Sequence, residues 1–473
     1  MIYNGIIFKN FNKFYKSYTL VGEMLYLRRE KAYKICIIQT LLLIKIFNKI
    51  LPFSCTCNLL AILFCIMNYN FKSAEKSLEI QFDRVNDIRD YNQRKVLEAF
   101  FDNKVAPEHF YTVSGYGHDD LGREVLDKTF AQVFKAERAL VRIHFASGTH
   151  TLACALFGNL RAGDKLISVA GAPYDTMQEV IGTAGDEETK RASLIGNGVL
   201  YDEVPLLNGS DIDFEKLEKM IDKTVTMVLI QRSKGYSTRK SLGIETIEQI
   251  CKTVKSKNPD CICFVDNCYG EFVDKREPLE VGADLMAGSL IKNPGGGIVE
   301  AGGYIAGKEL LVERAANRLT APGVGSEGGA MFNQHRLIFQ GLFMAPSIVS
   351  EAVKGAILAA KVFEDIGFDT YPKYNEPRTD IIQNIIFGNP DHLEQFCRTI
   401  QSLSPVNGYV TPIPENIPGY EDKVIMAGGT FIEGSTIELS ADGPMRAPYV
   451  AYLQGGLNYA HVKICLEDMV KKL

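Results

Sequence analysis

Two residues whose side chains could do chemistry together, Asp266 and Lys292, stand at the ends of predicted strands. Lys292 follows the apolar strand Leu285–Leu290 and enters a run of small residues that leaves room for a flat cofactor. An amine held in such a dry pocket has a lowered pKa and can form a Schiff base with a carbonyl group. Asp266 ends the buried-type strand Cys261–Val265, where its carboxylate could pair with a protonated ring nitrogen. Each also has an ordinary alternative, since Lys292 could be a surface lysine and Asp266 could cap the following turn.

Two further segments follow predicted strands and precede helices. Ser147, Gly148 and Thr149 could form an anion site, because backbone N–H groups at a helix N-terminus and two hydroxyl groups favour negative charge. Tyr174 could stack on a planar heterocycle. Taken alone, the first segment is a weak signal that could be an ordinary helix cap, and Tyr174 alone favours a loop residue with its hydroxyl in water. The order of these groups along the chain favours one shared site. An anion loop, an aromatic ring, a carboxylate and an amine follow one another, and each lies near a strand end.

The elements that must position these residues alternate between short apolar strands and amphipathic helices. This alternation predicts an α/β fold with a largely parallel sheet flanked by helices on both faces. Ligands of such sheets bind beyond the carboxyl ends of the strands, where the candidate residues lie. The predicted strands are Leu140–Phe145, Lys165–Val169, Val225–Ile230, Cys261–Val265, Leu285–Leu290 and Tyr304–Ala306, and the helices between them include His150–Leu160, Phe214–Lys223 and Glu245–Ser256.

The pattern predicts three parts after the first 67 residues: an N-terminal helical arm at 68–130, a large cofactor-binding domain at 131–340 and a smaller C-terminal α+β domain at 341–473. A mostly helical stretch that is interrupted by Pro346 would link the large domain to the small one. The segments behind this division are helices over Ser73–Phe101, Leu121–Phe134 and Ala330–Phe363, strands at Ile381–Phe387 and Thr436–Leu439, and a terminal helix after Tyr449.

Residues 1–67 differ in composition from the rest of the chain. Residues 1–72 carry ten lysines and arginines against two acidic residues, a charge of +8 in a chain whose net charge is -5. The apolar runs Ile35–Phe47 and Leu59–Met67 are interrupted or shorter than the ~20 residues that a spanning helix needs. The extension could be a membrane anchor, a targeting sequence or an upstream extension of the gene model. We favour the last, with translation starting at Met67, and expect a membrane partner only if the extension is real.

The overall composition narrows the class of protein. With 46% hydrophobic and 23% charged residues, the chain has the balance of a soluble globular protein. A net charge of -5 gives no general reason to expect a nucleic acid partner. The eleven cysteines form no Cys-x-x-Cys pair, and no histidine cluster is evident, so we expect no metal site. Scattered cysteines of odd number favour reduced thiols and a cytoplasmic location.

From about Asn68 to Leu473 the chain resembles the methionine γ-lyase-like proteins, also called the aluminium-resistance protein family. These proteins belong to the cystathionine lyase side of the fold-type I enzymes, which use pyridoxal 5′-phosphate (PLP). The segments that carry the resemblance are Ser114–Arg123, Phe145–His150, Pro173–Thr176, Gln231–Tyr236, Val265–Asn267, Gly288–Gly295 and Ser440–Arg446.

The resemblance implies a role for each candidate residue. Lys292 would carry PLP as a Schiff base and move protons, and Asp266 would pair with the pyridine nitrogen. Tyr174 would stack on the ring and could also act in catalysis as an acid or base. The phosphate would be bound by Ser147, Gly148, Thr149 and Ser289. Tyr116 lies where relatives of the cystathionine lyase type lend a tyrosine to the neighbouring subunit's phosphate site. The resemblance therefore implies a homodimer or homotetramer with an intersubunit active site.

The implied activity is PLP-dependent carbon–sulfur lysis of a sulfur-containing amino acid by β- or γ-elimination. Relatives hold the substrate carboxylate with an arginine in an Arg-Leu-Ser strand, but this chain has Glu438-Leu439-Ser440 there. Arg446 is the nearest replacement, since a guanidinium fork suits a carboxylate, and it is otherwise a surface arginine. Two alternatives remain open: an aminotransferase or other PLP reaction on an amino acid, and a PLP-binding stress protein with little catalysis.

Overall fold

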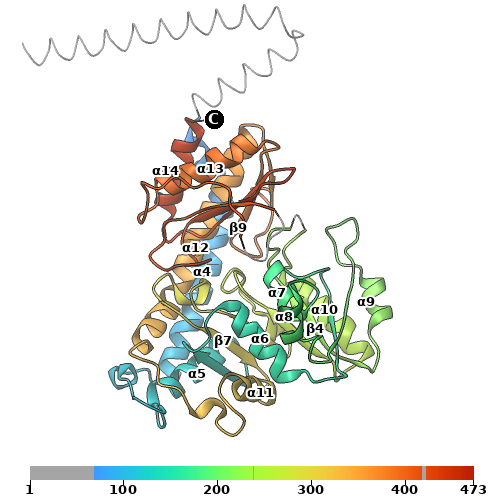
Figure 1. Ribbon diagram of the computed structural model, residues 1–473. Coiled ribbons are helices and arrows are strands. Elements are labelled where there is room, and N and C mark those ends of the chain that lie inside the picture. The colour runs from blue at the N-terminus through green and yellow to red at the C-terminus, as the bar shows by residue number, and fades with distance from the viewer. Residues whose placement is uncertain (1–68, 238, 418–421, 473) are drawn as a thin grey trace, which may run out of the picture. The chain divides into compact units, whose positions relative to one another are not determined.

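The computed structural model describes residues 69–237, 239–417 and 422–472. Residues 70–473 form one compact unit, which contains two sheets and the helices around them (Figure 1). The strands of the first sheet lie between residues 138 and 307, and those of the second lie between 369 and 454. The predicted N-terminal extension, residues 1–67, lies outside the described residues.

The first sheet has seven strands in the order β1-β7-β6-β5-β4-β2-β3. All neighbouring strands run parallel except β7, which is antiparallel to both β6 and β1. The predicted α/β fold with a largely parallel sheet is therefore confirmed. The strand bounds are β1 Arg138–Arg142, β2 Lys165–Ser168, β3 Leu200–Glu203, β4 Val225–Gln231, β5 Ile262–Asp266, β6 Leu285–Ser289 and β7 Gly303–Gly307.

Six of these strands were predicted, and β3 was not. Its residues at the edge of the sheet alternate between exposed and half-buried positions, so they form no apolar run. β4 and β5, in contrast, are buried along almost their whole length because helices cover both faces of the sheet. The α-helices between the start of β1 and Leu319 are α6 Gly148–Asn159, α7 Asp175–Ile181, α8 Glu187–Ala192, α9 Phe214–Met220, α10 Ile244–Lys257 and α11 Glu309–Leu319.

The core of this region lies between the sheet and the helices α6 and α11, which pack against each other. Leu152 of α6 and Ala315 of α11 are fully buried there, together with Leu229 and Phe264 from the sheet. Burial of such apolar side chains is the main force that holds α6 against the strand ends. The core therefore fixes where the N-terminus of α6 lies.

The second sheet has five antiparallel strands in the order β10-β11-β12-β9-β8. Helix α13, Pro390–Ser402, covers one face, and an added Cβ at Gly443 would lie 2.4 Å from Leu393 of this helix. The bounds are β8 Asp369–Tyr371, β9 Ile382–Ile386, β10 Val424–Ala427, β11 Ser440–Pro444 and β12 Val450–Gln454, followed by the predicted terminal helix, α14 Tyr459–Val470.

The prediction of a strand at Thr436–Leu439 is wrong, because the strand β11 begins at Ser440. The carboxylate of Glu438 accepts hydrogen bonds from the backbone N–H groups of Phe431 (3.1 Å) and Ile432 (3.0 Å). Because the Glu438 side chain binds these backbone N–H groups, the segment forms a loop and not a hydrogen-bonded strand.

The predicted interruption of the long helix at Pro346 is also wrong. Helix α12 runs without a break over His335–Asp365 and contains Pro346. Pro346 removes one hydrogen bond, but α12 is largely buried and packs along α4, Glu79–Asp102, so tertiary packing outweighs that loss. Among the described residues, α12 is also the one helix long and apolar enough to span a membrane, and 67% of its apolar window is buried inside the protein.

The N-terminal helices agree with the predicted pattern. α3, Phe71–Ser77, and α4 are separated only at Leu78, and α5 spans Leu121–Val133. The Asn70 side chain caps α3, and the Asp120 side chain caps α5 by accepting from Arg123 N. Short 3-10 turns complete the fold: η1 Pro107–Phe110, η2 Pro278–Val281, η3 Asn293–Gly295 and η4 Gly325–Glu327.

Candidate active site

A cavity of about 880 Å³ lies at the carboxyl ends of β2, β4, β5 and β6 and is bounded on its other side by one face of the second sheet. This is the edge of a parallel sheet where ligands are expected. Of the predicted site residues, those that line the cavity are Ser147, Gly148, Thr149, Tyr174, Asp266, Ser289, Lys292 and Arg446. Tyr116 is not among its lining residues.

One end of the cavity is formed by the N-terminus of α6 and the last residue of β6. Ser147 caps α6, with its Oγ accepting from His150 N at 3.1 Å. A Cβ added at Gly148 would lie 3.3 Å from Ser289 Cβ, so the helix N-terminus and the strand end are in close contact. The positive end of a helix beside hydroxyl groups is a suitable cradle for an anion such as a phosphate.

Tyr174 is positioned by the N-terminus of the next helix along the chain, α7, for which it is the N-cap residue. Its backbone N–H donates to Gln231 Oε1 at 2.9 Å, which ties it to the end of β4. Burial, together with the nearby Asp266 carboxylate, raises the pKa of the Tyr174 hydroxyl well above its usual value. The hydroxyl is therefore neutral and can donate a hydrogen bond.

Asp266 is the last residue of β5 and is almost completely buried. Its Oδ1 accepts from Cys268 N at 3.1 Å. Burial raises the pKa of Asp266, whereas this hydrogen bond and the charges of Lys292 and Arg239 oppose the rise. A buried carboxylate of this kind gains most by pairing with a positively charged group in the cavity.

Lys292 follows β6, and its Nζ lies 3.6 Å from the centroid of the Tyr269 ring. Burial alone would lower the pKa of Lys292, as the sequence predicted. Tyr269, Cys268 and Asp266 outweigh that effect, so the pKa of Lys292 is raised above its usual value. The predicted lowering of the Lys292 pKa is therefore not found, because acidic and hydrogen-bonding groups surround the amine.

Tyr269 and Cys268 were not predicted as site residues. Both line the cavity and are buried, and Tyr269 has a positive φ of 69°. A hydrogen bond joins the side chains of Tyr269 and Lys292. The only sequence signal was their place in the segment directly after Asp266, since a positive φ at a tyrosine is not visible in a sequence.

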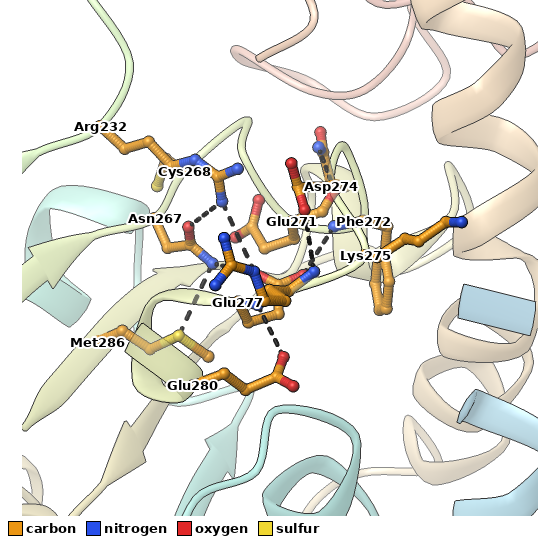
Figure 2. A network of polar contacts seen from close by, with 12 residues as sticks. Arg232, Asn267, Cys268, Glu271, Phe272, Asp274, Lys275, Glu277, Glu280 and Met286 are labelled. Atoms are coloured by element: carbon orange, nitrogen blue, oxygen red, sulfur yellow. Dashed lines mark hydrogen bonds and ion pairs between the residues drawn. The ribbon is translucent and has the colours of Figure 1, made fainter. Parts of the chain in front are cut away.

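Asn267, the residue after Asp266, belongs to a buried polar network with Arg232 and Glu277 (Figure 2). Arg232 Nη1 donates to Asn267 Oδ1 at 2.8 Å, and Asn267 Nδ2 donates to Glu277 Oε2 at 3.1 Å. Arg232 and Glu277 also form an ion pair of 3.7 Å. Because Asn267 follows Asp266 directly, this network holds the end of β5 in place.

A second buried carboxylate, Glu271, supports the neighbouring strand end. Tyr304 OH donates to Glu271 Oε1 at 2.8 Å, and Asn293 Nδ2 donates to the backbone oxygen of Glu271 at 2.9 Å. Burial raises the pKa of Glu271 to about 8. Because Asn293 follows Lys292 directly, the backbone on both sides of the site is tied to buried polar groups.

Arg446 and Tyr116, the remaining predicted residues, are both exposed. The Arg446 side chain is 55% exposed at the rim and forms an ion pair with Asp422 at 3.0 Å. Tyr116 is 83% exposed, and its ring lies 5.8 Å from the His118 ring. No group of three or more histidines, cysteines, aspartates or glutamates that could hold a metal ion occurs among the described residues.

The fold and the site define a fold-type I α/β protein with a lysine, an aspartate and an anion cradle around one cavity. Residues 67–473 match the model of the methionine gamma-lyase family, so the chain belongs to that family. The family and the similar structures indicate a carbon–sulfur lyase of the cystathionine or methionine type.

Similar proteins occur in several bacteria. The uncharacterized protein YnbB of Bacillus subtilis is 47% identical over 390 residues, which cover 82% of this chain and 92% of YnbB. A Clostridium novyi structure described as a carbon-sulfur lyase involved in aluminum resistance is 48% identical, has a TM-score of 0.81, and covers 85% of this chain and 94% of its own. A methionine gamma lyase from Micromonospora echinospora, CalE6, is 15% identical with a TM-score of 0.53 over 78% of this chain and 93% of its own. That last likeness shows the fold alone.

Proposed function

We propose that this protein is a PLP-dependent carbon–sulfur lyase that acts on a sulfur-containing amino acid, with Lys292 as the covalent anchor of the cofactor. The observation that carries the proposal is the meeting of Lys292, Asp266 and the Ser147–Thr149 segment around one cavity. These residues come from the ends of three separate strands. Binding of one shared ligand explains why they meet at the same cavity. Family membership supports the same assignment.

The residues fit PLP by their chemistry. The N-terminus of α6, with Ser147, Thr149 and Ser289, offers donors for a phosphate, and Gly148 leaves the space that a Cβ would reduce. Asp266 offers a buried carboxylate for the ring nitrogen, and Tyr174 offers a neutral aromatic ring. Lys292 offers the amine that would hold the cofactor carbonyl carbon.

Bound PLP supplies an electron sink for the charge left when the α-proton of an amino acid is removed. In the proposed mechanism, the Lys292 amine, which lines the cavity, would accept the α-proton and later return it. The negative charge of Asp266 would stabilise a positive charge on the ring nitrogen of the cofactor. Tyr174 holds the ring and can donate a proton to the departing sulfur. Overall, the amino acid and one water give a thiol, a 2-oxo acid and ammonium.

We further propose that the active unit is a homodimer or homotetramer. Tyr116 is highly exposed and does not line the cavity of its own chain, which suits a residue that reaches a neighbouring subunit. A Tyr116→Phe variant should retain the oligomer but bind PLP more weakly. Mixing Tyr116→Phe and Lys292→Ala chains should restore some sites with both residues if the site is shared between subunits.

The first test is an absorbance spectrum of the purified protein with PLP, before and after borohydride reduction, with mass analysis of the Lys292 peptide. A band near ~420 nm that reduction traps on Lys292 would support the proposal. Lys292→Ala should bind PLP without this trapping and should lose turnover by several orders of magnitude. A protein that shows no band with added PLP would contradict the proposal.

The reaction type is tested separately by its products. Incubation with S-substituted cysteines and with methionine should release thiol, 2-oxo acid and ammonium in equal amounts. Transfer of the amino group to an added 2-oxo acid, without thiol release, would instead identify an aminotransferase.

A further inference from the structure

The face of the second sheet that lines the cavity carries a buried carboxylate, Asp442, which the proposed cofactor site does not use. Asp442 lies in the middle of β11, and both of its neighbours in the strand contact helix α13. A Cβ added at Gly443 would meet Leu393 of this helix. On the other side, Cys397 Sγ of the helix donates to Ala441 O. Since successive side chains of a strand point to opposite faces, Asp442 points the other way, into the cavity that it lines.

Asp442 is only 5% exposed and forms no ion pair with any described residue. Its carboxylate receives a hydrogen bond from the Tyr236 side chain, and burial raises the pKa of Asp442 to about 6. The carboxylate is still ionised at neutral pH. A buried negative charge without a cation is costly, and a cationic ligand in the cavity would relieve that cost.

The positively charged side chains at the cavity are already engaged elsewhere. Lys234 Nζ donates to Tyr371 O at 3.1 Å, and Arg446 forms its ion pair with Asp422. Lys292 contacts the Tyr269 ring and is the proposed anchor of the cofactor. None of these groups neutralises Asp442 in the structure.

Aromatic rings lie beside Asp442. The Tyr236 and Tyr452 rings are 5.1 Å apart at an interplanar angle of 50°, and both line the cavity. Tyr452 is paired directly across from Asp442 in the antiparallel ladder of β11 and β12. A carboxylate beside two aromatic residues suits an ammonium group, which gains from both the negative charge and the electron-rich rings.

We propose that Asp442, with Tyr236 and Tyr452, binds a cationic group on the leaving half of the substrate. The preferred substrate class is then an amino acid whose sulfur substituent ends in an ammonium group, and a neutral S-alkyl amino acid such as methionine is a poorer substrate. This inference rests on the proposed function, because the α-amino group must reach the cofactor at Lys292 and cannot also occupy Asp442.

The positions within the cavity agree with this assignment. The charge of Asp442 acts on Tyr269, the residue that contacts Lys292, so the proposed ammonium site lies within reach of the reacting end. A cavity of about 880 Å³ has room for the cofactor and an extended amino acid. The substrate would lie between the sheet edge that holds Lys292 and the face of the second sheet that presents Asp442.

The test uses the PLP-loaded enzyme and two substrates of the same length, S-(2-aminoethyl)-L-cysteine and S-propyl-L-cysteine. We expect kcat/KM to favour the aminoethyl substrate by about tenfold or more, since a buried charge-assisted hydrogen bond is worth this much. Asp442→Asn, which keeps the shape of the side chain, should abolish this preference and change kcat/KM for the propyl substrate by less than about threefold. Glu433→Gln is the matched control, because Glu433 is an exposed carboxylate at the same cavity.

Equal losses on both substrates in Asp442→Asn, or no preference in the unaltered enzyme, would overturn the inference. A parallel measurement separates it from the proposed lyase activity: spectral titration with L-lysine and L-norleucine, which carry no leaving group. Tighter binding of L-lysine that disappears in Asp442→Asn supports the ammonium site even if no carbon–sulfur bond is broken. If both probes bind equally while sulfur compounds are cleaved, the lyase stands and the ammonium site is wrong.

Discussion

The ammonium nitrogen of Lys292 lies 3.6 Å from the centre of the Tyr269 ring and is hydrogen bonded to the Tyr269 side chain. The two residues come from different strand ends, since Tyr269 follows β5 and Lys292 follows β6. The contact holds the lysine amine in the cavity and stabilises its charged form. It also places Tyr269 where it can influence the pH at which the Lys292 amine loses its proton and becomes reactive.

The first prediction concerns the hydroxyl of this tyrosine. Tyr269→Phe removes a hydrogen bond that raises the pKa of Lys292, so the pKa of that amine should fall by up to about one unit. The measurement is the rate at which PLP attaches to the cofactor-free protein as a function of pH. The midpoint should move to lower pH in the variant and stay in place in Tyr236→Phe. An unchanged midpoint in Tyr269→Phe would show that the hydroxyl does not tune Lys292.

A second prediction tests the packing beneath β6. A Cβ added at Gly288 would lie 2.5 Å from Glu271 Oε1 and 2.7 Å from Tyr304 Cε1, and both side chains are fully buried. Gly288→Ala should therefore lower the free energy of unfolding by about 1–3 kcal/mol. Chemical denaturation measures this change. Adding Glu271→Ala should recover part of the loss, and a fully stable Gly288→Ala variant would refute the predicted clash.

The third prediction follows from the raised pKa of Glu271, about 8 in the folded protein. The unfolded chain releases this proton near the ordinary pKa of glutamate, at lower pH than the folded protein does. The folded state therefore loses stability as pH rises from about 4.5 to about 8, and the loss is complete above that range.

Glu271→Gln removes this loss while keeping the acceptor for Tyr304. The stability of the variant relative to the unaltered protein should thus increase by roughly 2–4 kcal/mol between pH 5 and pH 9. Denaturation curves of both proteins at the two pH values give the difference. A difference that does not depend on pH would mean that Glu271 is ionised in the folded protein.

The fourth prediction concerns the substrate carboxylate. If Arg446 turns from Asp422 to bind it, Arg446→Ala should raise KM about tenfold or more. Asp422→Ala frees the guanidinium from its ion pair and should leave KM unchanged or lower it. Steady-state kinetics with one sulfur amino acid would measure both. A KM in Arg446→Ala equal to that of the unaltered enzyme would assign Arg446 to the surface.

Local patterns were enough to predict most of the first sheet. Each of its buried strands is a short apolar run, and Asp266 and Lys292 stand at or just after the ends of two of them. The errors occurred where tertiary contacts outweigh local preference. Pro346 stays inside a helix because α12 is packed along much of its length, and Glu438 holds a loop where an apolar pattern suggested a strand.

The sequence by itself determined the order of the chemical groups along the chain, and parallel strands then bring their carboxyl ends to one edge. It also determined the α/β fold, because apolar runs and amphipathic helices have different periods. Only the tertiary structure decided that Tyr269 meets Lys292 and that Asp442 faces the same cavity. These contacts depend on a positive backbone φ and on how a second sheet packs against the first, and neither has a local sequence pattern.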